Sequence, residues 1–94
     1  MTDYSVQIAK NLKNIRKALG YTQMHVAQAI GVSYQQVQKY ESGVNRVSAE
    51  KLFALKVLYG VCFEDFFQGL SEAASEEGSD QRRERVHREF VSLL

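Results

Sequence analysis

Up to Phe67, apolar residues recur at the spacing of α-helices, and single glycines interrupt the pattern. Residues 8, 12, 15 and 19 are apolar at steps of four, three and four, which places them on one face of a helix predicted over 3–19. Glycines at 20, 31, 43 and 60 follow successive apolar stretches and are typical helix stops. The pattern predicts further helices over 22–30, 33–42, 48–59 and 61–67.

Three of these predicted helices begin at a hydroxyl residue. Thr22, Ser33 and Ser48 can each accept a hydrogen bond from a free N–H group of the first helical turn. Ser33 and Gln36 also have the spacing of a capping box, in which each side chain bonds the backbone of the other residue. The start of the helix over 33–42 is therefore the best specified boundary in the chain.

The predicted helix over 33–42 has one apolar and one polar face. At 100° per residue, Val37 and Tyr40 project towards the core. The opposite face is wholly polar and comprises Gln35, Gln38, Lys39 and Ser42. A solvated surface explains such a face, and so does contact with a polar macromolecule.

The chain changes character after Phe67, so the predicted domain ends at residue 68. Residues 69–80, GLSEAASEEGSD, are small, polar and acidic, which is typical of a flexible linker. Residues 81–94 predict a short amphipathic helix that is too short to be stable alone. Its apolar face consists of Val86, Phe90, Leu93 and Leu94.

Composition favours one small all-α domain with an appendage. The chain has 94 residues, of which 45% are hydrophobic, and it contains neither proline nor tryptophan. Cys62 is the only cysteine, and the sequence has no secretory h-region and no apolar run of about 18 residues. A soluble cytoplasmic protein that does not enter membranes is expected.

No catalytic or metal-binding constellation is visible in the sequence. His25 and His87 lie far apart without ligand partners at metal-binding spacing, and no glycine-rich phosphate loop occurs. Cys62 is interpreted as a small core or cap residue rather than a redox sensor. We therefore expect neither an enzyme nor a cofactor.

The distribution of charge changes this picture. The net charge of +1 argues weakly against nucleic-acid binding. Residues 1–67, however, carry eight Lys and Arg against five Asp and Glu, whereas residues 68–94 carry four against six. The basic excess lies in the predicted helical domain.

The elements assembled above resemble the Cro/CI-type, lambda-repressor-like helix-turn-helix family over residues 8–67. The resemblance is carried by Ala27, Gly31 and Val37 at steps of four and six, by Thr22-Gln23, by Glu41-Ser42-Gly43 and by Gly60-Val61. It implies a five-helix DNA-binding domain, here followed by a short C-terminal amphipathic helix. Departures from the family pattern occur at Val47, Tyr59 and Cys62.

The resemblance also implies roles for individual side chains on double-stranded DNA. Base contacts are expected from Tyr34, Gln35, Gln38 and Lys39. Phosphate contacts are expected from Gln23, Gln36, Ser42, Asn45 and Arg46. The alternative is ordinary surface polarity of a helix and a loop.

A structural ion pair is expected beneath this surface. Glu41 lies only about 40° from Val37 around its helix, so its carboxylate is near the core and needs a partner. The resemblance suggests Arg16, which flanks the apolar face of the first helix.

A homodimeric transcriptional regulator, repressor-like on an operator, is the function that the resemblance implies, with no small-molecule effector evident. The apolar face of 81–94 is the candidate dimerisation element; a frayed end or a helix folded back on its own domain is the alternative. Two other functions stay open. One is a protein-interaction module such as an antitoxin or antirepressor, and the other is a tail that lies on membrane surfaces.

Overall fold

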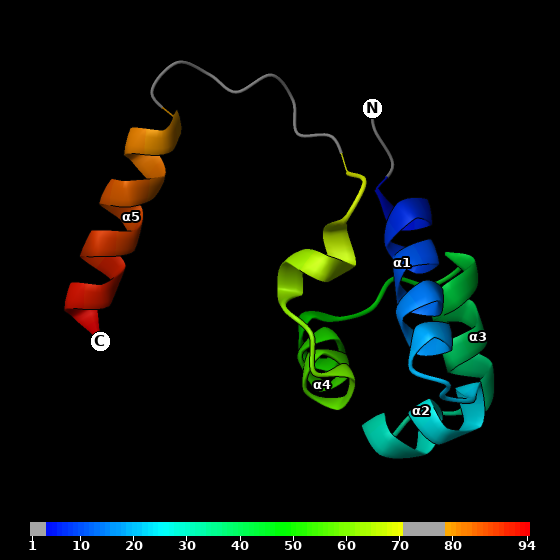
Figure 1. The fold of residues 1–94 in the computed structure, drawn as a ribbon. Coiled ribbons are helices and arrows are strands. Elements are labelled where there is room, and N and C mark those ends of the chain that lie inside the picture. Colours follow the sequence, from blue (N-terminus) through cyan, green and yellow to red (C-terminus); the bar gives the residue numbers. More distant parts are fainter. Residues whose placement is uncertain (1–3, 71–78) are drawn as a thin grey trace.

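The computed structural model describes residues 4–70 and 79–94, and every regular element in these ranges is helical. In chain order the elements are α1 (Ser5–Ala18), α2 (Gln23–Ile30), α3 (Tyr34–Ser42), α4 (Ala49–Tyr59), the 3₁₀ helix η1 (Phe63–Phe67) and α5 (Ser79–Leu93) (Figure 1). The predicted all-α class is confirmed. The predicted starts and stops of α2, α3 and α4 agree with the structure, because their caps are local features of the sequence.

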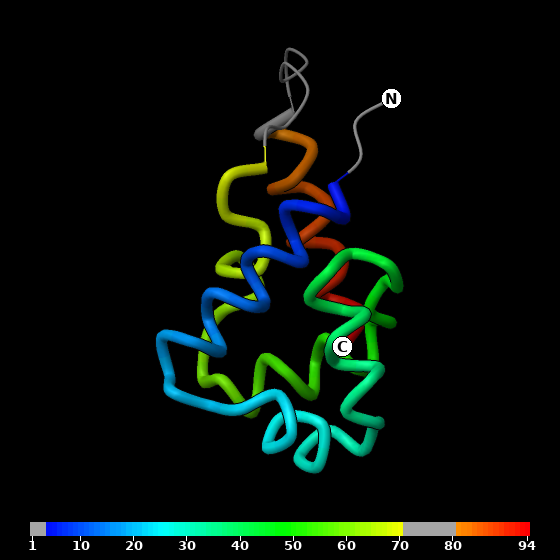
Figure 2. Tube along the Cα trace, turned by 90° about the vertical axis from the view of Figure 1, so that its right-hand side faces the viewer, coloured from blue at the N-terminus to red at the C-terminus, as the bar shows by residue number. Residues whose placement is uncertain are grey.

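The first four helices and η1 enclose one core. α3 packs against α1 and α2, α4 packs against α2, and η1 packs against α1, as the arrangement in Figure 2 shows. Phe66 is fully buried at the centre. The other buried members of the core are Leu12, Val26, Ala27, Ile30, Val37, Tyr40, Leu55 and Tyr59.

The buried face of α1 differs from the predicted one. Leu12 is buried and Ile8 and Ile15 pack against the core as predicted, whereas Leu19 is exposed, and Ala9, Asn11 and Arg16 are buried in addition. The predicted start at Asp3 lies outside the described residues. α1 is covered by α3 on one side and η1 on another, so its buried surface is wider than its apolar stripe.

The turn between α2 and α3 is tightly specified by its caps. Thr22 Oγ1 accepts a hydrogen bond from the N–H of His25, and Ser33 Oγ accepts one from the N–H of Gln36, both at 3.0 Å. Gly31 adopts a φ of 73°, a left-handed conformation that glycine reaches without a Cβ penalty. These features hold α2 and α3 at a fixed crossing.

The predicted helix over 61–67 is a 3₁₀ helix that begins at Phe63. Cys62 caps it, because its backbone N–H donates to Asp65 Oδ2 at 2.9 Å and its thiol accepts from the N–H of Asp65. Cys62 is exposed, so its interpretation as a core residue is wrong, whereas its interpretation as a cap residue agrees with the structure. Phe63 and Phe67 are partly exposed, and Phe66 alone of the three is fully buried.

α5 starts two residues before the predicted tail helix. Figure 1 shows it apart from the other helices, and residues 81–94 are exposed. Residues 71–78, which make up most of the predicted linker over 69–80, lie outside the described residues.

Candidate nucleic-acid interface

The outer face of α3 is open to solvent. Val37 and Tyr40 are buried, which turns the opposite side of the helix outwards. The exposed side chains include all four predicted base-contact residues and one predicted phosphate contact, namely Tyr34, Gln35, Gln38, Lys39 and Ser42. The face is one side of a nine-residue helix that α1 and α2 support from behind.

Two side chains on this face are already oriented. Gln38 Nε2 donates a hydrogen bond to the Tyr34 hydroxyl oxygen at 3.0 Å, one helical turn away. This bond leaves the second amide hydrogen and Oε1 of Gln38, and the hydroxyl hydrogen of Tyr34, for a partner outside the helix. The side chains of Gln35 and Lys39 form no hydrogen bond within the described part of the chain, and both are exposed.

An ion pair ties α3 to α1 beneath the exposed face. Arg16 Nε lies 2.7 Å from Glu41 Oε2, and Arg16 Nη2 lies 3.0 Å from Glu41 Oε1, so the contact is bidentate. The two side chains are 10% and 4% exposed. Arg16 Nη1 also donates to the carbonyl oxygen of Tyr21 at 2.8 Å. The hydrogen bond to Glu41 raises the pKa of Arg16, which stays charged.

The carboxylate of Glu41 also holds the start of α2. Gln23 Nε2 donates to Glu41 Oε1 at 3.0 Å, so one carboxylate positions α1, α2 and α3 relative to one another. Gln23, a predicted phosphate contact, is half-buried and retains its second amide hydrogen. The network fixes the angle at which the outer face of α3 is presented.

The loop after α3 is tied back to the helix by two hydrogen bonds of Asn45. Asn45 donates from its backbone N–H to the carbonyl oxygen of Lys39 at 3.2 Å and from Nδ2 to Gln36 Oε1 at 3.4 Å. The side chain of Gln36 therefore bonds Asn45, and the capping box predicted with Ser33 is made only from the Ser33 side. Ser42 Oγ donates to the same Lys39 carbonyl at 3.2 Å, so its hydroxyl must rotate before it can donate to a phosphate.

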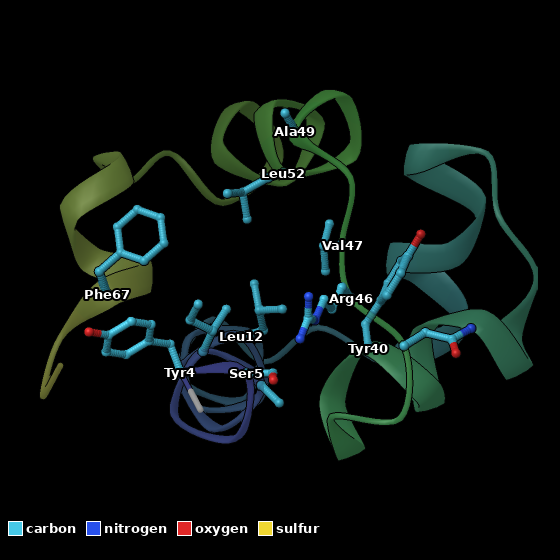
Figure 3. A pocket seen from close by; sticks show the side chains of 12 residues that line it. Tyr4, Ser5, Leu12, Tyr40, Arg46, Val47, Ala49, Leu52 and Phe67 are labelled. Carbon is cyan, nitrogen blue, oxygen red and sulfur yellow. The ribbon is translucent and has the colours of Figure 1, made fainter. Parts of the chain in front are cut away.

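A groove of about 700 Å³ adjoins this loop (Figure 3). Its walls come from the first half of α1, residues 45–47, the start of α4 and Phe67. Arg46 is the one charged side chain among the lining residues, and it is exposed. The predicted phosphate contact at Arg46 thus lines a mainly apolar groove, and its exposed guanidinium can reach solvent.

Two residues that support the interface have no clear signal in the sequence. Asn11 is buried in α1, where Nδ2 donates to the carbonyl oxygens of Phe66 and Gln68, each at 2.8 Å, and thereby fixes η1. Lys51 Nζ donates to the carbonyl oxygen of Ile30 at 2.8 Å and links α4 to the end of α2. A polar residue next to an apolar stripe is the only hint, and most such residues are solvated.

The part of the chain that the structure describes contains no group of three or more His, Cys, Asp or Glu side chains placed to hold a metal ion. Within residues 4–70 and 79–94, no helix combines the length and apolar character needed to cross a membrane.

The arrangement of α2, turn and exposed polar α3 on a helical body defines a helix-turn-helix protein. The chain belongs to the HTH_3 helix-turn-helix family, whose model matches residues 12–66. It is 31% identical over 90 residues to an uncharacterized HTH-type transcriptional regulator of Rickettsia conorii, a match that covers 92% of this chain and 72% of the relative. It is 37% identical over 91 residues to the HTH-type regulator y4wC of Sinorhizobium fredii, a match that covers 93% of this chain and 62% of the relative.

A solved structure agrees at the level of the fold. The restriction-modification controller protein C.AhdI from Aeromonas hydrophila superposes with a TM-score of 0.63 at 24% identity. This match covers 66% of the present chain and 94% of C.AhdI. The resemblance inferred from sequence to the helix-turn-helix regulators is confirmed, and the chain has the fold of a transcriptional regulator.

Proposed function

We propose that the protein is a homodimeric, sequence-specific DNA-binding transcriptional regulator that represses by occupying an operator in the cytoplasm. The observation that carries the proposal is the open polar face of α3, which the bidentate pair of Arg16 and Glu41 holds in place. A rigid helix with outward donors and acceptors is suited to the major groove, where each base pair presents a distinct hydrogen-bonding pattern.

Base reading is assigned to four side chains of α3. Gln35 has both a donor and an acceptor free and suits the N6 and N7 edge of adenine, and Lys39 suits O6 and N7 of guanine. Gln38 and Tyr34 are bonded to each other and act as one preoriented unit at the flank, where Tyr34 contacts a thymine methyl group or a phosphate.

Phosphate binding is assigned to residues around the ends of α2 and α3. Arg46 contributes most, because its full positive charge displaces condensed counterions and it has no internal partner in the described chain. The uncharged polar donors fix the register of the protein on the duplex instead. They are Gln23, Gln36, Ser42 and Asn45.

Pairing of two copies is part of the proposal, since one module of this size covers a single half-site. The sequence assigns pairing to the apolar face of α5. Val86 and Phe90 are more than half exposed, and Leu93 and Leu94 are almost fully exposed, so all four are available to a second copy.

Selection of bound duplexes from a random pool tests the proposal. We expect enriched sequences with two related half-sites separated by about one helical turn, or 10–10.5 base pairs. Affinity for the winning duplex should fall with salt at a log-log slope of roughly −5 to −9, as expected for ~6–10 neutralised phosphates. A pool without sequence enrichment, or binding that ignores salt, would remove the DNA-binding assignment.

A protein-interaction role, such as that of an antitoxin or antirepressor, is the second candidate. The exposed apolar residues of α5 favour it, because an uncovered amphipathic helix suits a groove on another protein. A stable complex with another protein that forms without DNA and is lost on Phe90→Asp would support this function. The same helix lying on a membrane surface is tested by flotation with anionic liposomes.

A further inference from the structure

The groove beside the loop over 45–47 has the size of a small-molecule site. Its volume of about 700 Å³ lies within the ~300–1,000 Å³ that is usual for such sites. α1 packs against α3 and η1, whereas α4 packs against α2, and the groove separates the first half of α1 from the start of α4 (Figure 3). A groove of these dimensions can enclose most of a small ligand.

Most of the lining of the groove is apolar. Leu12 of α1 and Leu52 of α4 face each other across it, and Phe67 closes one side (Figure 3). The lining part of α1 runs from Tyr4 to Leu12, which is about 12 Å along the helix axis at about 1.5 Å per residue. An extended chain of about ten carbon atoms has this length, since each C–C bond of about 1.5 Å advances it by roughly 1.25 Å. The walls therefore suit a flexible hydrocarbon chain of medium length.

One side of the groove carries a positive charge. Arg46 lies across the groove from Phe67, and Figure 3 shows its nitrogen atoms on the groove side of the loop. Its guanidinium forms no ion pair within the described chain, and no Asp or Glu is among the residues that line the groove. Next to it, Asn45 uses one amide hydrogen for Gln36 and retains the other. A guanidinium binds a carboxylate through two parallel hydrogen bonds, so this side of the groove suits a carboxylate.

We propose that the groove binds a medium-chain fatty carboxylate, with its carboxylate on Arg46 and its chain between Leu12 and Leu52, and that this ligand releases the protein from DNA. The binding follows from the lining of the groove, whereas the release rests on the proposed function, in which Arg46 contacts a phosphate. A guanidinium that holds a carboxylate cannot hold a phosphate with the same donors. Ligand and DNA therefore compete for Arg46, and each lowers the affinity for the other by the same factor.

Isothermal titration of the full chain with decanoate, below its micellar concentration and without DNA, tests the site. Wild type should bind one decanoate per protomer. Arg46→Gln should weaken decanoate binding at least fivefold and leave the binding of 1-decanol unchanged, because the alcohol has the same chain without a charge. Wild type that does not bind decanoate, or Arg46→Gln that binds it as wild type does, overturns the proposal.

Filling the groove provides a second measurement that leaves Arg46 in place. Ala49 is the exposed first residue of α4 and lines the groove, so Ala49→Phe fills it without replacing a core side chain. Ala18→Phe is the matched control, because Ala18 is exposed at the end of α1 and does not line the groove. Circular dichroism should show the wild-type helix content in both variants. Ala49→Phe should weaken decanoate binding at least tenfold, and Ala18→Phe should bind as wild type does. Equal binding by Ala49→Phe overturns the placement of the ligand in the groove.

The apolar face of α5 is the competing occupant of the groove. Phe90→Asp disables this face and should bind decanoate as wild type does. Decanoate binding that occurs in Phe90→Asp but not in wild type would mean that α5 fills the groove, and it overturns the proposal.

Binding to DNA separates this inference from the proposed function. Bound decanoate should weaken the binding of wild type to its selected operator several-fold and should not affect the binding of Ala49→Phe. An operator affinity that bound decanoate leaves unchanged overturns the competition for Arg46. Wild type that binds decanoate but no DNA would refute the regulator and keep the ligand site. Wild type that selects an operator but does not bind decanoate would refute the ligand site and keep DNA binding.

Discussion

Replacement of Glu41 by alanine tests the central structural argument. The change removes two hydrogen bonds to Arg16, at 2.7 and 3.0 Å, and the bond from Gln23 at 3.0 Å. Arg16 then keeps only its bond to the carbonyl oxygen of Tyr21, although its side chain is 10% exposed. Breaking one side of such a buried pair costs ~3–5 kcal/mol, because the remaining charge is desolvated without compensation.

This cost is large for so small a domain, whose total stability is expected to be about 5–15 kcal/mol. At about 4–8 °C per kcal/mol, the melting temperature of Glu41→Ala should fall by at least ~12 °C. Urea denaturation followed by circular dichroism measures the loss of unfolding free energy. Because urea is uncharged, it does not screen the ion pair. Glu50→Ala is the matched control, because this exposed acid in the first turn of α4 contributes only about 0.3–1 kcal/mol through the helix dipole.

A double substitution separates loss of charge balance from loss of packing. Arg16→Met combined with Glu41→Leu removes both charges, so it should recover most of the stability that Glu41→Ala loses. A free energy of unfolding of Glu41→Ala within about 1 kcal/mol of the wild-type value would contradict this account, because a buried guanidinium without its carboxylate partner costs more than that.

Gln35→Ala should relax the preference at one base position by about 1–3 kcal/mol, measured on operators with single substitutions; an equal loss at every position contradicts base reading. Arg46→Ala should weaken all sequences alike and reduce the salt slope by about one per protomer, and an unchanged slope contradicts the phosphate contact. Burial raises the pKa of Tyr59 above its ordinary 10.0. Above pH 10 the unfolded chain therefore loses this proton while the folded chain keeps it, and stability falls as pH rises. Tyr59→Phe should show a shallower decline of the urea midpoint between about pH 9 and 11.5; an identical decline refutes the assignment.

Much of the helix-turn-helix was predictable because its signals are local. Thr22, Ser33 and Ser48 accept the hydrogen bonds expected of caps, and Gly31 has the positive φ expected of a helix stop. The hydrogen bond of each of these caps joins residues three positions apart, so the local sequence is enough to predict it. The polar outer face of α3 follows equally from helical periodicity once Val37 is placed inside.

Other features depend on contacts between distant segments. The apolar stripe on α1 did not predict that Asn11 is buried, because its amide donates to the carbonyl oxygens of Phe66 and Gln68, more than fifty positions later in the chain. Gln36 was expected to complete a local cap, but it bonds Asn45, which the loop brings within reach. Exposure of Phe53 and Val57 was equally invisible, since an apolar residue in α4 is normally part of the core.

The sequence by itself therefore determined where α2, α3 and α4 begin and end and which side of α3 is polar, because caps and periodicity act within one or two turns. Only the tertiary structure decided how α1 is rotated, that Gln23 bonds the same carboxylate as Arg16, and which apolar side chains remain uncovered. These features depend on the packing of neighbouring helices, which places together residues that no short-range pattern relates.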